Sequence, residues 1–424
     1  MSHPSHNAGD DRGQYHEEFI PQNSAWFGAV LAVAATYVFF LIFAQFGFLK
    51  VVQTVLGEQG RLLKPIMAAM GLAGLGGSAW AAFRFVENHA QRRMVGLFAT
   101  CGAAAGLSLV ANSAALLFVV AVLTGFGTGG LTVTLAGILR RVTGGDRLGT
   151  AVGFGTGAAY AFCNLPFVFN AGREAQAFFA LGATCVGILA VQMLDLRAPR
   201  QVPDSFDYRP SGVAAWVLIF LALVWLDSGA FYIIQHSPYL KELTWGAGRL
   251  WANAAIHFAA ALLAGYMMDK RWVGRAVLAA AALLLTACVL IEPNRQKFTE
   301  GVLLYTAAVS IYSTALVFYP ARGSRPQLAA VVYGVAGWIG SALGIGMVED
   351  MLAIPRWFVA TAGLVMVVGL VGRGWMLRRN TRRAAAGLLA LALLGAGARF
   401  AKNVSPVDAR ALNQVAHPGS AGNE

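Results

Sequence analysis

The feature that most constrains this chain is a series of apolar runs, each about as long as a membrane-spanning helix, separated by short polar turns. A helix needs about 20 mostly apolar residues to cross the hydrocarbon core of a bilayer. Twelve runs meet that description. They cover residues 26–49, 65–85, 94–112, 114–139, 148–169 and 176–194, then 212–235, 248–268, 274–291, 301–320, 327–348 and 357–377. The sequence therefore predicts an integral membrane protein made of helices.

Composition excludes the soluble alternative. Of the 424 residues, 57% are apolar and 12% are charged, whereas soluble domains carry about 25% charged residues. A soluble chain of this composition lacks the polar groups needed to cover its surface. The net charge of +12 fits cytoplasmic loops rich in Lys and Arg. No basic stripe with interleaved aromatics is present, so we expect no nucleic-acid partner.

The runs divide into two sets of six, and this division predicts the domain organisation. We expect a cytoplasmic tail over residues 1–25, a six-helix bundle over 26–195, a cytoplasmic linker over 196–211 and a second six-helix bundle over 212–377. A basic turn and a thirteenth spanning helix follow over 378–401, and an external polar tail over 402–424. The predicted fold is an all-α membrane protein of two pseudo-symmetric bundles plus one extra helix.

Basic residues at alternate turns predict the orientation. Arg92 and Arg93, Arg140 and Arg141, and the Arg378–Arg383 cluster lie at turns on the same predicted side. Lys and Arg collect on the cytoplasmic side, so the N-terminus is placed in the cytoplasm. An odd number of spans then places the C-terminus in the periplasm. Abundant Arg, Ala and Gly favour a bacterial source, and hence the bacterial inner membrane.

Motifs of catalysis and of metal or cofactor binding are missing from the sequence. No Gly-x4-Gly-Lys-Ser/Thr phosphate loop and no Cys-x-x-Cys-His haem site is present, so we expect neither an enzyme nor a bound cofactor. The four cysteines lie apart inside apolar runs and do not form a metal-ligand pattern. Met67 and Met70 have helical spacing and thioethers suit Cu(I), but methionine is also a common gap-filler. No metal site is predicted.

Polar side chains embedded in the second set of runs are the candidate site. An ionisable residue near the bilayer centre is costly and usually functional. Asp227 and His257 fall at similar depths on consecutive antiparallel helices, which predicts a hydrogen-bonded pair. Asn253, Tyr232, Gln235 and Tyr312 lie at helical spacing around them, and tyrosines recur at 305, 312 and 319. The pair is either a proton- or cation-responsive site or a structural link between helices.

A loop after the eighth run carries the most specific motif. Its residues are Gly265, Asp269, Lys270, Arg271, Gly274 and Arg275. The run resembles the gating-loop motif of the major facilitator superfamily, with one additional residue before Gly274. The fourth run and its exit also resemble this family. Glycine-rich stretches at corresponding places in the fifth and eleventh runs support an internal duplication of the two halves. The matching loop of the first half, residues 84–93, lacks the expected Gly and Asp.

This resemblance, over residues 26–380, implies a function. Family members are secondary transporters whose two halves rock about a central cavity lined by helices one, four, seven and ten. It places Tyr37 and Gln45 of the first run beside that cavity. We therefore expect a secondary transporter that moves a small solute across the bacterial inner membrane by alternating access, with proton coupling as a variant.

A second function remains open at this point. The degenerate first loop and the thirteenth helix favour a non-transporting relative that serves as a subunit or assembly factor of a respiratory or electron-transfer complex. Its partner, in the membrane or the periplasm, would bind the extra helix and the C-terminal tail. Copper import for oxidase assembly is a minor variant of this alternative.

Overall fold

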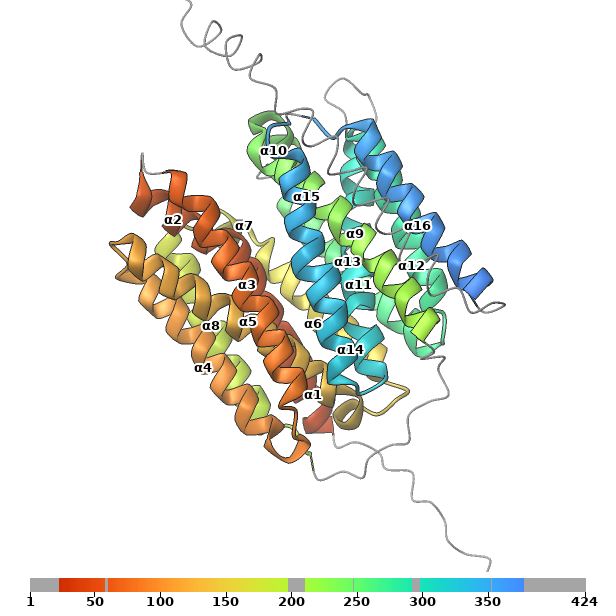
Figure 1. The fold of residues 1–424 in the computed structure, drawn as a ribbon, viewed down its shortest axis with the longest axis horizontal. Coiled ribbons are helices and arrows are strands. Elements are labelled where there is room, and N and C mark those ends of the chain that lie inside the picture. The colour runs from red at the N-terminus through yellow and green to blue at the C-terminus, as the bar shows by residue number, and fades with distance from the viewer. Residues whose placement is uncertain are drawn as a thin grey trace, which may run out of the picture.

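The computed structural model describes residues 23–57, 60–196, 210–246, 248–291, 298–351 and 353–376. Every regular element in these ranges is a helix. Figure 1 shows two groups of helices side by side, with α1–α8 in one group and α9–α16 in the other. The prediction of an all-helical fold is therefore confirmed for the described residues.

The first group begins with one continuous helical run that holds a π-helical segment. Its elements are α1 (Asn23–Val38), η1 (Phe39–Gly47), α2 (Phe48–Leu56), η2 (Gly60–Leu62), α3 (Leu63–Phe83), η3 (Glu87–His89), α4 (Ala90–Leu109), α5 (Ala114–Thr143), α6 (Leu148–Cys163), α7 (Pro166–Phe169) and α8 (Arg173–Gln192). Helix α5 packs against α3 and α4, and α1 packs against α6 and α8. Ser113 caps α5 by accepting a hydrogen bond from the Leu116 amide, and Gly144 ends it at a positive φ of 76°.

The second group is built around α9 and α13. Its elements are α9 (Pro210–His236), α10 (Pro238–Trp245), α11 (Leu250–Asp269), α12 (Val273–Leu290), α13 (Phe298–Arg322), α14 (Pro326–Val331), η4 (Val332–Ile339), α15 (Gly340–Val348) and α16 (Arg356–Met376). Helix α9 packs against α15 and α16, while α13 packs against α11 and α12. A second π-helical segment, η4, interrupts the run from α14 to α15.

Nine helices within the described residues are long and apolar enough to cross a membrane. They are Asn23–Leu56, Leu63–Phe83, Ala114–Thr143, Arg173–Gln192, Gly212–His236, Leu250–Asp269, Val273–Leu290, Thr299–Arg322 and Pro326–Val348. The chain is therefore a multi-pass membrane protein. Helix α6 has only 16 residues, fewer than the about 20 that cross the core.

Several predicted boundaries are corrected. The first helix runs on to Leu56 instead of ending at residue 49. The fifth run, 148–169, breaks after Cys163, because Pro166 disfavours helical backbone at the residue before it and starts the separate helix α7. Helix α10 was not predicted. The N-terminal tail up to residue 22, linker residues 197–209, the thirteenth helix and the C-terminal tail lie outside the described residues.

Several helix pairs join the groups, α13 with α5 and α6 among them, and glycines make the closest approaches. Helix α6 packs against α11, and α3 packs against α14 and η4. A Cβ at Gly265 would overlap the carbonyl oxygen of Gly149, and one at Gly153 would overlap that of Ala261. Between α3 and η4, the ring of Trp338 lies over Gly74. Small residues therefore let the backbones touch where lipid supplies no hydrophobic drive between helices.

Candidate functional site

Helix α13 supplies most of the polar side chains at the centre of the molecule. Its hydroxyl groups contact α9 and α11 of its own group and α6 of the other. Its Ser313 carbonyl accepts a hydrogen bond from Tyr37 of α1. The side chains involved are Tyr305, Thr306, Ser310, Tyr312, Ser313 and Thr314. Ser310, Ser313 and Thr314 lie near the middle of the 25-residue helix Phe298–Arg322. We call these six residues and their partners the polar core.

Asp227 is the charged member of the polar core. It lies on α9 and is partly buried. The hydroxyl of Tyr305 donates to its Oδ1 at 2.5 Å, and the hydroxyl of Tyr312 donates to its Oδ2. Tyr305 and Tyr312 are seven residues apart, two helical turns, so both face α9. Among the described residues, no basic side chain forms an ion pair with Asp227.

The predicted Asp227–His257 pair is replaced by a different arrangement. His257 is 7% exposed, and its Nδ1 lies 2.6 Å from the hydroxyl oxygen of Ser310. Its ring stacks on Tyr160 of α6, with centroids 4.6 Å apart. Both predicted residues therefore contact α13, but on different faces. The sequence placed Asp227 and His257 at a similar depth, and in the structure both lie beside residues 305–312 of α13. The sequence could not show that α13 lies between them.

Hydroxyl groups of α13 also contact the first group directly. Thr314 and Thr156 are joined by their hydroxyl oxygens at 3.0 Å, and Ser313 is joined to the Tyr160 hydroxyl at 3.0 Å. The Tyr37 hydroxyl donates to the Ser313 carbonyl at 3.4 Å. These contacts link α1 and α6 to α13 across the interface. Sequence reasoning found Tyr37 but missed the others, although a hydroxyl at almost every turn of 301–320 was a usable signal.

Asn253 joins three elements of the second group. Its side chain is 1% exposed. Its Nδ2 donates to the Thr244 carbonyl of α10 at 2.9 Å, and its Oδ1 accepts from Thr306 of α13 at 3.5 Å. Both ends of the amide therefore have partners. Asn253 is thus a member of the polar core, as the partner of Thr306, and its two hydrogen bonds go to neither Asp227 nor His257.

Three other predicted residues lie away from Asp227. Tyr232 stacks on His236, with centroids 4.0 Å apart, at the end of α9. Gln235 follows on the same turn and is partly buried. Gln45 lies in the π-helical segment η1 and is also partly buried. The structure does not bring these three side chains into the hydrogen-bonded network of the polar core.

Four aromatic side chains cover the end of the polar core that lies nearest to α7 and α10. The rings of Phe46 and Phe231 lie 5.3 Å apart, and so do those of Phe231 and Trp245. Phe169 contacts both Phe46 and Trp245 at 5.8 Å. These four rings come from η1, α7, α9 and α10, so they join the two groups. We call them the aromatic quartet.

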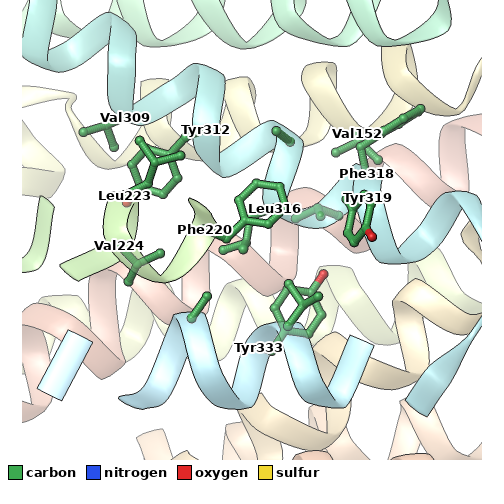
Figure 2. Close-up of a cluster of buried hydrophobic side chains, with 14 of the residues drawn as sticks. Val152, Phe220, Leu223, Val224, Val309, Tyr312, Leu316, Phe318, Tyr319 and Tyr333 are labelled. Atoms are coloured by element: carbon green, nitrogen blue, oxygen red, sulfur yellow. The ribbon is translucent and has the colours of Figure 1, made fainter. Parts of the chain in front are cut away.

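A second apolar layer closes the opposite end. Figure 2 shows Tyr312 and Leu316 of α13 beside Leu223 of α9. Further along α13, Tyr319 packs on Trp216 at 5.2 Å and on Phe220 at 5.8 Å. Tyr333 of η4 faces the same cluster. Asp227 therefore lies between two layers of packed rings.

Beyond this layer, Asp269 of the predicted gating loop binds the first turn of α6. Its Oδ1 accepts from the Gly149 amide at 2.6 Å, and its Oδ2 accepts from the Thr150 amide at 2.7 Å and the Thr150 hydroxyl at 2.6 Å. A carboxylate is favoured at a helix N-terminus because it pairs with amides that lack helical partners. Asp269 therefore connects the two groups at this end.

Two basic residues of the gating loop pack over aromatic rings close to them in the sequence. Arg271 has a positive φ of 64°, which accommodates the additional residue before Gly274. Lys270 lies over the ring of Tyr266 at 5.5 Å, and Arg275 lies over that of Trp272 at 5.2 Å.

No family model matches the sequence, and no curated protein matches it. Solved structures do match the fold. A human organic anion transporter, MFSD10 (TETRAN), superposes with a TM-score of 0.59 at 14% identity, over 84% of this chain and all of that one. A bacterial homologue of the iron transporter ferroportin, in an outward-facing state, superposes with a TM-score of 0.58 at 11% identity, over 84% of this chain and 99% of that one.

The chain has the major facilitator fold. The resemblance inferred from the gating loop is confirmed by superposition over most of the chain, independently of sequence identity. At identities of 14% and 11% the likeness shows the fold alone. Function has to be argued from the site.

Within this major facilitator fold, the degenerate loop of the first half makes different contacts from its counterpart. Glu87 pairs with Arg141 of α5 at 2.8 Å, inside its own group. The crossing to the second group is made instead by Gln327 of α14, whose Nε2 donates to the Ala82 carbonyl at 3.3 Å. Glu87 therefore pairs within its own group, whereas Asp269 caps helix α6 of the opposite group.

Clustered metal-ligand side chains are missing from the described ranges. No group of three or more His, Cys, Asp or Glu side chains lies close enough to hold a metal ion there. Met70 is buried in the apolar core of the first group, with Met67 packed against the same cluster. The two thioethers therefore occupy packing positions.

Proposed function

We propose that this protein is a secondary transporter that moves a small solute across the bacterial inner membrane by alternating access. In this proposal the chain forms two pseudo-symmetric six-helix halves and a thirteenth spanning helix. The N-terminus lies in the cytoplasm and the C-terminus in the periplasm. The loops that hold Glu87, Asp146 and Asp269 then lie on the cytoplasmic side.

The observation that carries the proposal is Asp227, a carboxylate on a spanning helix that is held by two tyrosine hydroxyls. A carboxylate at such a depth is costly, and the tyrosines reduce that cost by donating to its charged form. No cation of the described residues neutralises it. Asp227 can therefore take up a proton or bind a cationic group of a solute.

The surrounding hydroxyl groups support a binding role for the polar core. Thr156 contacts Thr314, and Tyr160 contacts Ser313, across the interface between the groups. When two halves rock apart, such cross-interface contacts break and expose donors and acceptors to the cavity. A solute with hydroxyl or amine groups would replace them. His257, stacked on Tyr160, would line the same cavity.

The closures at both ends support alternating access. The aromatic quartet closes one end, and the Asp269 contacts with α6 close the other. Opening one end while the other stays closed would give Asp227 access to one side at a time. Since Asp227 is anionic when ionised, it favours a cationic solute, or a neutral or anionic one that moves together with a proton.

Transport by the reconstituted full chain tests this function. Proteoliposomes would be offered labelled organic cations, organic anions and ferrous iron, because the structural neighbours include organic anion and iron transporters. Internal pH would be followed with a dye. We expect uptake of at least one compound, and we expect Asp227→Asn to lower it about tenfold or more, as the loss of a charged interaction predicts.

Matched variants separate the role of Asp227 from general damage. Tyr333→Phe removes a buried tyrosine hydroxyl that is not bonded to Asp227 and should leave uptake within about twofold. His257→Ala should lower uptake as well. Normal uptake by both Asp227→Asn and His257→Ala would refute the proposed site. Absence of uptake together with a stable co-purified membrane complex would support the non-transporting alternative.

A further inference from the structure

A cavity of about 350 Å³ lies at the gating-loop end of the molecule, apart from the polar core. It is lined by the α3–α4 loop, the last turns of α5 and the loop between α13 and α14, so both helix groups contribute. Gly323 at its edge is eleven residues beyond Tyr312, which corresponds to about 16 Å along a helix axis. The cavity is therefore distinct from the Asp227 site.

Arginine dominates the charge of this cavity. Its charged lining residues are Arg140, Arg141, Arg325 and Glu87, so three positive charges against one negative leave a net +2. Arg141 pairs with Glu87 at 2.8 Å. Arg140 is only 8% exposed, and its Nη1 donates to the Arg322 carbonyl at 2.7 Å. Arg325 lies exposed at the rim.

This concentration of guanidinium groups in a concave surface indicates an anionic ligand. Guanidinium groups present several donors in a plane that match phosphate oxygens two at a time. Glu87 is the one carboxylate among the residues that line the cavity. Ser324 and Gln327 add neutral polar groups to the same walls.

We propose that this cavity binds a phosphate group, either as inorganic phosphate or as the headgroup of an anionic phospholipid. The ligand would contact α5 from one group and the α13–α14 loop from the other. It would therefore favour the arrangement in which the two groups are closed at this end. The role would be regulation of the conformational equilibrium, not transport through the polar core.

Binding to the purified full chain in mild detergent tests the site without any transport assay. The melting temperature would be measured with sodium phosphate against sodium chloride at equal ionic strength, and with phosphatidylglycerol against diacylglycerol. A ligand that binds only the folded state raises the melting temperature in a saturable way. A shift with inorganic phosphate identifies the free anion; a shift with phosphatidylglycerol alone identifies the headgroup.

Three variants complete the test. Arg141→Gln and Arg325→Gln should each weaken apparent binding about tenfold or more, as expected for the loss of a charge-assisted contact. Arg325 is exposed, so its variant should fold even where changes deeper in the cavity do not. Arg92→Gln removes the same charge from an exposed position at the same end and should leave binding unchanged. Absence of a shift with every probe, or equal weakening by Arg92→Gln, would overturn the proposal. Either result would leave the proposed transport function standing.

Discussion

At the residue scale, the polar core shows how a membrane helix accommodates a carboxylate. Tyr305 and Tyr312 both donate to Asp227 from one face of α13. Each tyrosine also fills apolar volume with its ring, and both side chains are 5% exposed. Tyrosine suits this position because one end of the side chain is apolar and the other needs a hydrogen-bond partner.

Removing one of these donors should destabilise the protein. We expect Tyr312→Phe to lower the free energy of unfolding by about 1 kcal/mol, because a charge-assisted hydrogen bond is lost inside a membrane bundle. Thermal unfolding in detergent measures the change. Tyr333→Phe serves as the control and should lie within about 0.5 kcal/mol of the unmodified protein. Equal losses of unfolding free energy in both variants would mean that the hydrogen bond to Asp227 stabilises the protein no more than the Tyr333 hydroxyl does.

At the element scale, close helix crossings depend on small residues at specific places. Gly149 and Gly153 of α6 meet Gly265 and Ala261 of α11, backbone against backbone. Other glycines of the spanning helices, such as Gly182 of α8, have open space where a side chain would be. Some glycines of the sequence pattern are therefore required by a close helix contact, whereas others occupy positions with room for a side chain.

Enlarging a contact glycine should separate α6 from α11. We expect Gly265→Ala to cost about 1–3 kcal/mol of stability, as overpacking of a close interface does, because its Cβ would overlap the Gly149 carbonyl. The melting temperature in detergent measures this effect. Gly182→Ala is the matched control on a spanning helix and should raise stability slightly or leave it unchanged. A larger loss in the control would contradict the assignment.

The Asp269 contacts can be tested through the amides that they occupy. We expect Asp269→Asn to speed hydrogen exchange at Gly149 and Thr150, because the carboxylate that accepts from both amides is neutralised. Exchange followed by mass spectrometry on peptides of the α5–α6 loop gives the readout. Asp350→Asn, an exposed carboxylate at the end of α15, should leave those peptides unchanged. Unaltered exchange in Asp269→Asn would show that α6 is fixed by packing alone.

At the scale of the whole molecule, the two helix groups are held together at both ends by different chemistry. Backbone contacts, the Asp269 contacts and the arginine cavity lie at one end. At the other end are the aromatic quartet and an exposed ion pair, Lys64 with Glu349 at 3.0 Å. Unequal closures allow one end to open before the other, which alternating access requires.

Charge reversal at this exposed pair should bias the opening of that end. We expect Lys64→Glu to place like charges together and populate conformations open at this end, while Lys64→Glu combined with Glu349→Lys restores the original distribution. Electron spin distances between labels at Thr54 and Tyr239, exposed positions near this end in opposite groups, report the change. If the double variant behaved like the single one, the ion pair would have no part in the equilibrium.

The sequence by itself determined that this chain spans a membrane many times, and it predicted Asp227 and Tyr312 as candidate site residues, because hydropathy and helical spacing are local properties. Tertiary structure decided the rest. Helix packing places α13 between Asp227 and His257, brings glycines of α6 against α11, and gathers arginines around one cavity. These features depend on tertiary structure, because residues distant in the chain meet only when the helices assemble. The segment after residue 376 stays a sequence prediction.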